Sequence, residues 1–489
     1  MYTLGIDIGS SSVKVSLLDV AKGKSIASDF FPKKEMEITA IQAGWAEQHP
    51  DMWWKNMSLA LESTLEQAQI NRNEIKAIGI SYQMHGLVCI DKEGNVLRPS
   101  IIWCDSRAVE IGKEVNEKLG AEFCLENFLN SPGNFTASKL KWVKDNEPEL
   151  YEKIDKIMLP GDYMAYKLTG VCGTTISGLS EGILWNFKQN EIALDLLKEM
   201  GIGDELLPEI LENFTPQGEL LPAIAEELGL PAGIPVSYRA GDQPNNAFSL
   251  NVLNPGEVAA TAGTSGVVYG VSDLQKYDDQ SRVNTFAHVN HTVDNSRLGI
   301  LLCINGTGIL NSWLRKNICP ELSYEAMNDE ASKVAPGSDG LNLYPFGNGA
   351  ERVLGNQNPG ASFKDLNFNI HSRGHILRAA QEGIAFSFKY GMDIMKDLGI
   401  NMTVIKAGKA NMFLSPIFRE TLANVTVAKI ELYDTDGAEG AARGAALGAG
   451  IYNNLQETFA SLNKLEEIYP EEAKREEYQQ IYTNWKTKV

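Results

Sequence analysis

Residues 2–19 read YTLGIDIGSSSVKVSLLD. Two apolar runs, at 2–8 and 13–18, flank the turn residues Gly-Ser-Ser-Ser, and this pattern predicts an antiparallel hairpin. Asp7 interrupts the first run two residues before Gly9. A carboxylate inside an apolar strand costs free energy unless it binds something, so we expect Asp7 to hold a ligand.

A related hairpin lies near the middle of the chain. Residues 261–273 read TAGTSGVVYGVSD and align with residues 7–19 at an offset of 254 residues. Because this offset is just over half of the 489 residues, the simplest interpretation is two domains of similar architecture. We expect them to span 1–243 and 244–489.

Elsewhere, strand-like runs alternate with helical patterns, which predicts the α/β class. Residues 437–450, GAEGAARGAALGAG, are rich in small side chains, and we expect a helix there that lies close against its neighbour. Strands are expected at 75–82, 87–90, 235–240, 257–261 and 267–271, and helices at 51–70, 139–155 and 375–398.

The composition excludes several classes of protein. The chain has 44 Lys and Arg against 63 Asp and Glu, so its net charge of −19 argues against nucleic acid as a partner. It has no apolar stretch long enough to cross a membrane and no basic leader at its start. Six scattered cysteines without a C-x-x-C pair indicate reduced thiols. We therefore expect a cytoplasmic protein that binds neither nucleic acid nor membrane.

The usual nucleotide-binding motifs are missing. The chain has neither G-x-x-x-x-G-K-[ST] nor G-x-G-x-x-G after a strand, which disfavours P-loop NTPases and Rossmann dehydrogenases. The two hairpin turns remain as candidate phosphate sites, since glycine backbone and hydroxyl groups together can bind an anion. Asp7 beside the first turn is a hard oxygen ligand of the kind that Mg²⁺ prefers. The turn residues are Ser10, Ser11 and Ser12 in the first hairpin and Gly263, Thr264 and Ser265 in the second.

Asp242 is our candidate general base. It follows the expected strand at 235–240 and precedes Pro244, so it also fits the N-cap of a helix. The two roles are compatible, because α/β proteins gather chemistry at the C-terminal ends of their strands.

Taken together, the motifs resemble the FGGY family of carbohydrate kinases, and most of all its xylulokinase branch. The matches follow one another in order across nearly the whole chain. They are 7–12 (DIGSSS) with Lys14, 44–50 (GWAEQHP) with Trp53 and Trp54, 83–86 (QMHG), 103–107 (WCDSR), 139–143 (KLKWV), 240–242 (AGD), 263–266 (GTSG), 380–383 (AQEG) and 415–419 (SPIFR).

This resemblance implies two RNase H-like domains of the actin/hexokinase superfamily with an interdomain cleft in which sugar and ATP meet. It implies ATP and Mg²⁺ as cofactors, with Asp242 as the catalytic base and Asp7 as the second catalytic carboxylate, both beside the metal. The residues that it assigns to ATP are Ser10, Ser11, Ser12, Lys14, Gly263, Thr264, Ser265, Gly306, Gly408 and Asn411.

Gln83, Met84 and His85, with Asp242, are expected to bind the sugar, because they combine polar groups with a soft apolar one. The expected reaction converts D-xylulose to D-xylulose 5-phosphate. L-xylulose, ribulose, a hexulose or a polyol remain open as acceptors. An actin-like or chaperone-like ATPase and a non-catalytic sugar sensor are the rival functions, and a homodimer is expected only from the family.

Overall fold

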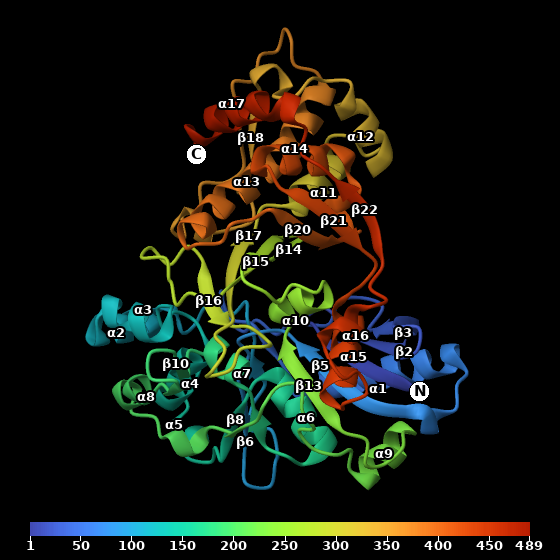
Figure 1. The fold of residues 1–489 in the computed structure, drawn as a ribbon. Coiled ribbons are helices and arrows are strands. Elements are labelled where there is room, and N and C mark those ends of the chain that lie inside the picture. The colour runs from blue at the N-terminus through green and yellow to red at the C-terminus, as the bar shows by residue number, and fades with distance from the viewer. The chain divides into compact units, whose positions relative to one another are not determined.

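The computed structural model describes residues 1–489. Contacts between Cα atoms divide the chain into two units (Figure 1). Unit 1 comprises Met1–Asn251, Phe286–Leu298 and Thr435–Leu462, and unit 2 comprises Val252–Thr285, Gly299–Asp434 and Asn463–Val489. Each unit therefore contains segments that are far apart in the sequence. A domain boundary at residue 243 stays a prediction.

Unit 1 is built on a five-stranded mixed sheet of order β3-β2-β1-β5-β13. The expected hairpin at its centre is confirmed, since β1 pairs antiparallel with β2 and Asp7 lies opposite Lys14. β5 runs parallel to both β1 and β13. The strands are β1 (Tyr2–Ile8), β2 (Val13–Asp19), β3 (Lys24–Phe31), β5 (Ile75–Tyr82) and β13 (Val236–Gly241).

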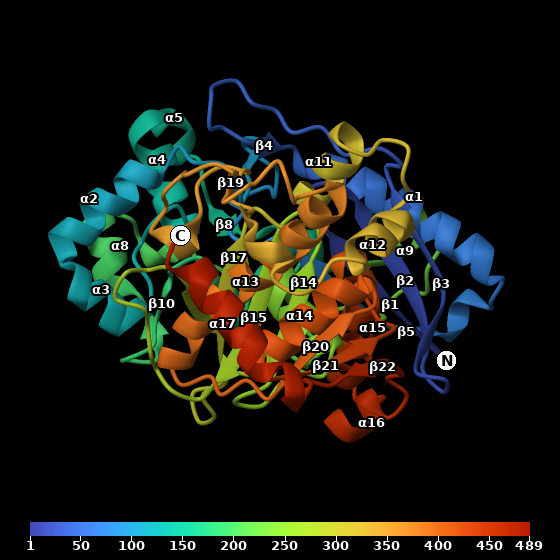
Figure 2. The same ribbon diagram turned by 90° about the horizontal axis from the view of Figure 1, so that it is seen from above.

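Helix α15 (Gly437–Gly448) belongs to unit 1 although it lies near the C-terminus of the chain. Figures 1 and 2 show it in red beside the blue strands β1 and β5. A Cβ atom at Gly5 would lie 1.8 Å from the Ala438 carbonyl oxygen, and one at Gly79 would lie 2.0 Å from that of Ala441. The helix therefore contacts the strand backbones directly, which confirms the close packing expected from its small residues.

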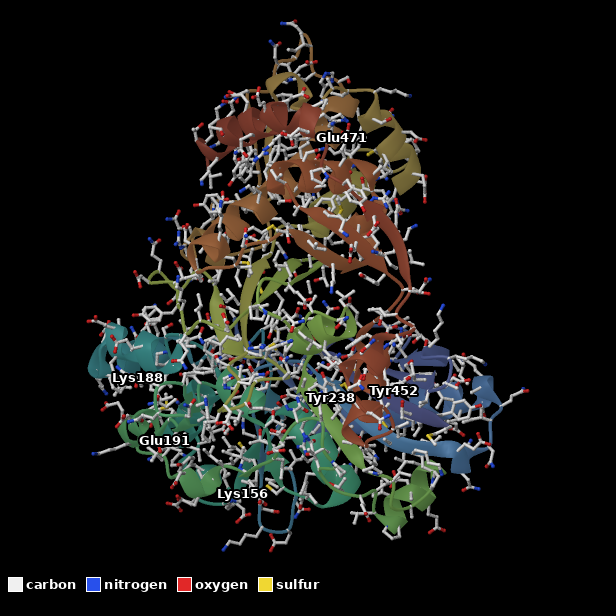
Figure 3. All side chains as sticks on the ribbon, in the orientation of Figure 1. Lys156, Lys188, Glu191, Tyr238, Tyr452 and Glu471 are labelled. Atoms are coloured by element: carbon white, nitrogen blue, oxygen red, sulfur yellow. The ribbon has the colours of Figure 1, made fainter.

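Further contacts secure this helix within unit 1. The Tyr238 ring of β13 lies against Gly444, where a Cβ atom would be 2.5 Å from the ring. The Tyr452 hydroxyl, just beyond the helix, donates a hydrogen bond to the Val20 carbonyl at 2.8 Å. Both tyrosines are labelled in Figure 3. These contacts fix the position of α15 on the sheet.

Unit 2 contains a seven-stranded sheet of order β16-β17-β15-β14-β20-β21-β22. β14 pairs antiparallel with β15 and parallel with β20, which runs parallel to β21. Numbered along the chain, β14, β15, β17, β20 and β21 repeat the 3-2-1-4-5 order of the unit 1 sheet. The α/β class and the duplicated RNase H-like sheet are thus confirmed. The strands are β14 (Val258–Ala262), β15 (Gly266–Ser272), β16 (Asn284–Ala287), β17 (Leu298–Ile304), β20 (Val404–Gly408), β21 (Lys429–Tyr433) and β22 (Lys464–Ile468).

Most expected helices are present, with one exception. α1 and α13 confirm two expectations, but the single helix expected over 139–155 is wrong: α4 ends at Asn146 and α5 starts at Pro148. Proline disfavours the helical conformation in the residue before it, and Glu147, with φ −130° and ψ 54°, interrupts the helix.

None of the helices is long and apolar enough to cross a membrane. The helices of unit 1 are α1 (Pro50–Ala68), α2 (Val109–Leu119), α3 (Ala121–Phe128), α4 (Thr136–Asn146), α5 (Pro148–Tyr151), α6 (Pro160–Thr169), α7 (Ile176–Glu181), α8 (Leu194–Met200), α9 (Pro222–Leu228), α10 (Asp242–Ser249), α15 and α16 (Leu455–Phe459). Those of unit 2 are α11 (Gly308–Asn317), α12 (Tyr324–Ser332), α13 (Arg373–Asp397), α14 (Pro416–Thr426) and α17 (Arg475–Lys486).

Candidate active site

The C-terminal ends of β1, β5 and β13 lie at one edge of the unit 1 sheet, because the three strands are parallel. Tyr82, the last residue of β5, is in register with Ile8 of β1 and with Gly241 of β13. Asp7 and Asp242 therefore come to the same edge from strands on either side of β5. This is the edge at which α/β sheets present reactive groups.

Asp7 is partly exposed and lies beside the N-terminus of α15. Burial raises the pKa of its carboxyl, and the nearby Asp436 carboxylate raises it further, while Ser81 and Lys14 oppose the rise. Lys14 Nζ forms an ion pair with Asp436 at 2.5 Å. A Cβ atom at Gly437 would lie 2.5 Å from Asp7 Oδ2, so only glycine allows the helix to start this close to the carboxylate.

Asp242 is the first residue of α10 rather than its cap. Gly241 occupies the N-cap position, and no side chain makes a capping hydrogen bond there. The alternative role of Asp242 as an N-cap is therefore wrong. Burial, followed by repulsion from Asp7, raises its pKa to about 7, against the opposing effect of hydrogen bonds from Gln243. Near neutral pH this partly exposed carboxyl can both accept and release a proton.

Asp7 and Asp242 suit a divalent cation that also binds phosphate. Repulsion from the Asp7 carboxylate raises the pKa of Asp242, and a cation would relieve that repulsion. The protein has no cluster of three or more His, Cys, Asp or Glu residues that could enclose a metal. Mg²⁺ usually takes only one or two carboxylates and completes its shell with phosphate and water, so this donor set fits it.

The expected sugar-binding residues form the turn after β5. The Gln83 N–H donates to the Ile8 carbonyl at 2.8 Å, and its Nε2 donates to Gln48 Oε1 at 3.2 Å. Its own Oε1 is buried and has no hydrogen-bond partner. Met84 is buried, and a Cβ atom at Gly241 would lie 2.6 Å from its Cγ. The turn is therefore held against both β1 and the start of α10.

His85 adopts an unusual backbone conformation, with a φ of 63°. Its half-buried ring makes contacts with the rings of Phe135 and Phe286, at centroid distances of 4.9 and 5.4 Å. His85 therefore lies on the same turn as Gln83 and Met84, with its ring against two phenylalanine rings.

The first hairpin turn is held by its carbonyl groups. The Gly9 N–H donates to Ser12 O at 3.0 Å, and Gln48 Nε2 donates to Ser10 O at 2.7 Å. The Ser11 side chain remains exposed. Gly9 does not have a positive φ, so this turn does not use the left-handed backbone that glycine allows. The turn instead has little room for a side chain at this position, since a Cβ atom would lie 3.1 Å from Ser12 O.

In unit 2, the corresponding turn contacts the start of α11. The N–H of Gly308 donates to Gly263 O at 2.9 Å, and that of Ile309 donates to Thr264 O at 3.1 Å. Thr264 and Ser265 are exposed. With its carbonyls occupied, the turn presents its hydroxyl groups to solvent.

The other residues assigned to ATP lie around this turn. Gly408 ends β20, and Asn411 follows three residues later with its side chain exposed. Asn411 Nδ2 lies 3.6 Å from the Cβ position of Gly263, so these segments meet. Gly306 is buried in the loop before α11, and its N–H donates to Glu351 Oε1 at 2.8 Å. Unit 2 therefore brings Gly263, Gly408 and Asn411 together, while the Gly306 N–H already has a partner.

Sequence reasoning missed four residues of these sites. Asp436 and Gly437 had a signal, because an Asp before a helical pattern predicts an N-cap, and Asp436 Oδ1 does accept the Glu439 N–H at 3.0 Å. Glu351 and Glu181 had none, because nothing in the local sequence shows that these acids are buried and only the fold brings them to the sites.

Comparison with known proteins identifies the class. Residues 2–249 match the N-terminal domain of the FGGY family of carbohydrate kinases, and residues 258–452 match its C-terminal domain. The chain belongs to this family, and it is an ATP-dependent carbohydrate kinase.

Among particular relatives, it is 28% identical to the xylulose kinase of Bacillus subtilis, over 99% of this chain and 96% of that protein. It is 29% identical to the xylulose kinase of Haemophilus influenzae, over 100% and 99% of the two chains.

Solved structures agree on the fold. A ligand-bound xylulose kinase and a gluconate kinase, both from Lactobacillus acidophilus, each superpose with a TM-score of 0.90 at 22% identity, covering 99% of this chain and 97% of theirs. Plasmodium falciparum glycerol kinase with ADP has a TM-score of 0.87 at 22% identity, over 100% and 98%. These likenesses establish the fold and leave the acceptor to be argued from the site.

Proposed function

We propose that this kinase transfers the γ-phosphoryl group of ATP to a ketose, converting D-xylulose to D-xylulose 5-phosphate. The observation that carries the proposal is Asp242, a partly exposed carboxyl with a pKa of about 7 at the edge of the sheet where Met84 and His85 also lie. The similarity to several xylulose kinases over the whole chain supports the choice of sugar.

In the proposed reaction Asp242 acts as the general base. As the sugar hydroxyl attacks the γ-phosphorus, its proton passes to an Asp242 carboxylate oxygen, and ADP leaves. The raised pKa suits this task, because a base is most effective when its pKa lies near the working pH. Phosphoryl transfer needs little covalent help, so the other residues position the reactants and stabilise charge.

The sugar is proposed to lie against the turn after β5. Met84 offers an apolar contact, and the unpartnered Gln83 Oε1 can accept a hydrogen bond from a hydroxyl group. The half-buried His85 ring completes this set. An open-chain ketose presents hydroxyl groups and apolar C–H edges together, which fits such a surface.

ATP is proposed to bind through both hairpin turns, with Ser10, Ser11, Ser12 and Lys14 in unit 1. In unit 2, the exposed Thr264 and Ser265 side chains and the neighbouring Gly263, Gly306, Gly408 and Asn411 take this role. Asp7 and Asp242 would hold Mg²⁺, which when bound neutralises charge on the phosphate tail. We place the reaction in the cytoplasm and propose a homodimer on the family precedent alone.

The decisive experiment is a coupled assay of ADP release with a panel of pentuloses, hexuloses, polyols and gluconate. We expect D-xylulose to give the highest kcat/KM. Preference for L-xylulose, ribulose, gluconate, glycerol or a hexulose would reassign the acceptor and leave the kinase class intact. ATP hydrolysis that no sugar stimulates would instead favour an ATPase machine, and sugar binding without ADP release would favour a sensor.

A further inference from the structure

Glu181 is a buried carboxyl that the mechanism above does not use. It is the last residue of α7, and its side chain is fully shielded from solvent. Its Oε1 accepts a hydrogen bond from the His85 N–H at 3.2 Å, and its main-chain carbonyl accepts one from His85 Nδ1 at 2.9 Å. One residue therefore contacts both the backbone and the ring of His85.

These contacts act on a backbone conformation that needs support. A φ of 63° places His85 in the left-handed region, which is strained for a residue with a Cβ atom. Lys139 Nζ adds a third restraint by donating to the His85 carbonyl at 2.7 Å. A strained residue persists where its surroundings over-determine it, and here two side chains and one carbonyl do so.

The second oxygen of Glu181 reaches the other half of the site. Glu181 Oε2 is buried without a hydrogen-bond partner and lies 2.5 Å from the position that a Cβ atom at Gly241 would occupy. Gly241 directly precedes Asp242, and the same Cβ position is 2.6 Å from Met84 Cγ. The carboxyl thus fills the space between the His85 turn and the first residue of α10.

We infer that Glu181 is a positioning residue that sets the Met84–His85 turn relative to Asp242, and thereby determines how well the sugar is held before the base. The inference rests on the proposed function for its kinetic consequence, but the structural contacts can be tested without any substrate. A small displacement of a positioning contact can lower activity by about 10²-fold, so the effect is measurable.

The raised pKa of Glu181 makes Gln the conservative replacement for this residue. Burial raises the pKa of this carboxyl well above its usual range, and the neighbouring Asp242 and Asp162 raise it further, against the His85 N–H and Lys139. Burial therefore favours the neutral form of the carboxyl. Gln has the same shape as that neutral form and the same acceptor oxygen for the His85 N–H.

The test compares Glu181→Ala with Glu181→Gln, using the sugar that gives the best turnover. We expect Glu181→Ala to raise KM for the sugar about 10- to 100-fold while KM for ATP changes less than about 2-fold. Glu181→Gln should restore KM to near the wild-type value. If Glu181→Ala does not fold, Glu181→Asp replaces it, because its shorter side chain also withdraws from His85.

Ser177→Ala is the matched control, because it removes one buried hydrogen bond from the same helix, to Ala287 O at 2.9 Å, without touching His85. We expect it to leave the ratio of the two KM values unchanged. Equal effects of Ser177→Ala and Glu181→Ala, or an unchanged KM for the sugar in Glu181→Ala, would overturn the inference.

A crystal structure of Glu181→Ala decides the matter independently of the assay. Relaxation of His85 out of the left-handed region supports the positioning role, even if no sugar in the panel is a substrate and the proposed function has failed. A His85 that keeps its φ and its distance from Asp242 contradicts it.

Discussion

At the residue scale, Asp242 is notable because two opposing effects set the pKa of its carboxyl. Hydrogen bonds from Gln243 lower this pKa, but burial and repulsion from Asp7 outweigh them and raise it to about 7. The carboxyl can therefore act as a base although it accepts hydrogen bonds at the start of α10. The sequence pattern of Asp before Pro244 predicted an N-cap, but it could not show that Gly241 takes the cap and leaves Asp242 as the first helical residue.

Replacing Asp242 with Asn should retain the fold and ATP binding but lower kcat by roughly 10²–10⁴-fold, because the amide cannot accept the hydroxyl proton. Steady-state kinetics with the preferred sugar and nucleotide titration by calorimetry provide the measurements. Turnover within a few-fold of the wild type would show that Asp242 is not the base.

The same variant should unfold at a higher temperature than the wild type at pH 8. The carboxyl keeps its proton up to about pH 7 when folded, but loses it near 3.8 when unfolded, so its contribution to stability is lost as the pH rises between these values. Asn does not titrate and avoids this loss. Thermal melts at pH 5 and pH 8 test the sign, and a lower melting temperature of the variant at both pH values would contradict it.

The pH dependence of kcat/KM should show the ionisation of the Asp242 carboxyl. Because the base must be deprotonated, kcat/KM should fall about tenfold for each pH unit below about 7, where Asp242 takes up its proton. Activity assays from pH 5 to 9 measure this limb. A flat profile through pH 6 would mean that no group with this pKa controls the reaction.

At the scale of single elements, α15 can lie close to the sheet because the strand residues that face it are glycines. Gly5 and Gly79 have no side chain where the backbones of Ala438 and Ala441 contact the strands. The small residues of 437–450 made this close approach predictable. The partner strands were not predictable, because nothing in the local pattern connects residue 441 with residue 79.

Gly79→Ala should destabilise unit 1 by about 1–3 kcal/mol or more, because the new methyl group would meet the Ala441 carbonyl oxygen at 2.0 Å. Gly263→Ala is the matched control: its Cβ atom would make only ordinary contacts, the nearest at 3.6 Å, and its φ is not positive. Urea titration of both variants measures the difference. Equal midpoints would show that helix and strand can separate without cost.

At the scale of the whole molecule, the sequence predicted the two hairpins and the α/β class because apolar alternation and turn residues are local signals. The strand order repeated in both sheets confirms the interpretation that the short internal match suggested. The composition of unit 1 from three segments was beyond reach, since it depends on the contacts of 435–462 with residues near the N-terminus. Asp7 and Asp242 were predicted because each lies at a local strand pattern, whereas Glu181 was not, because only the fold brings it to the site.

Residues 1–251 expressed alone should therefore fail to form a stable domain. They lack α15, whose buried residues cover β1, β5 and β13, and the uncovered strands would expose apolar surface. Circular dichroism melts and light scattering of this fragment measure the effect, with the full chain as the control. A cooperative melt close to that of the full chain would show that α15 is dispensable.

The position of α15 also has a consequence for biosynthesis. The strands β1 and β5 are translated early, but the helix that covers them is translated only after nearly all of unit 2. During most of its elongation, the nascent chain therefore exposes apolar N-terminal strands that α15 has not yet covered. Such a protein should depend on holding chaperones during translation, and slower translation should increase that dependence.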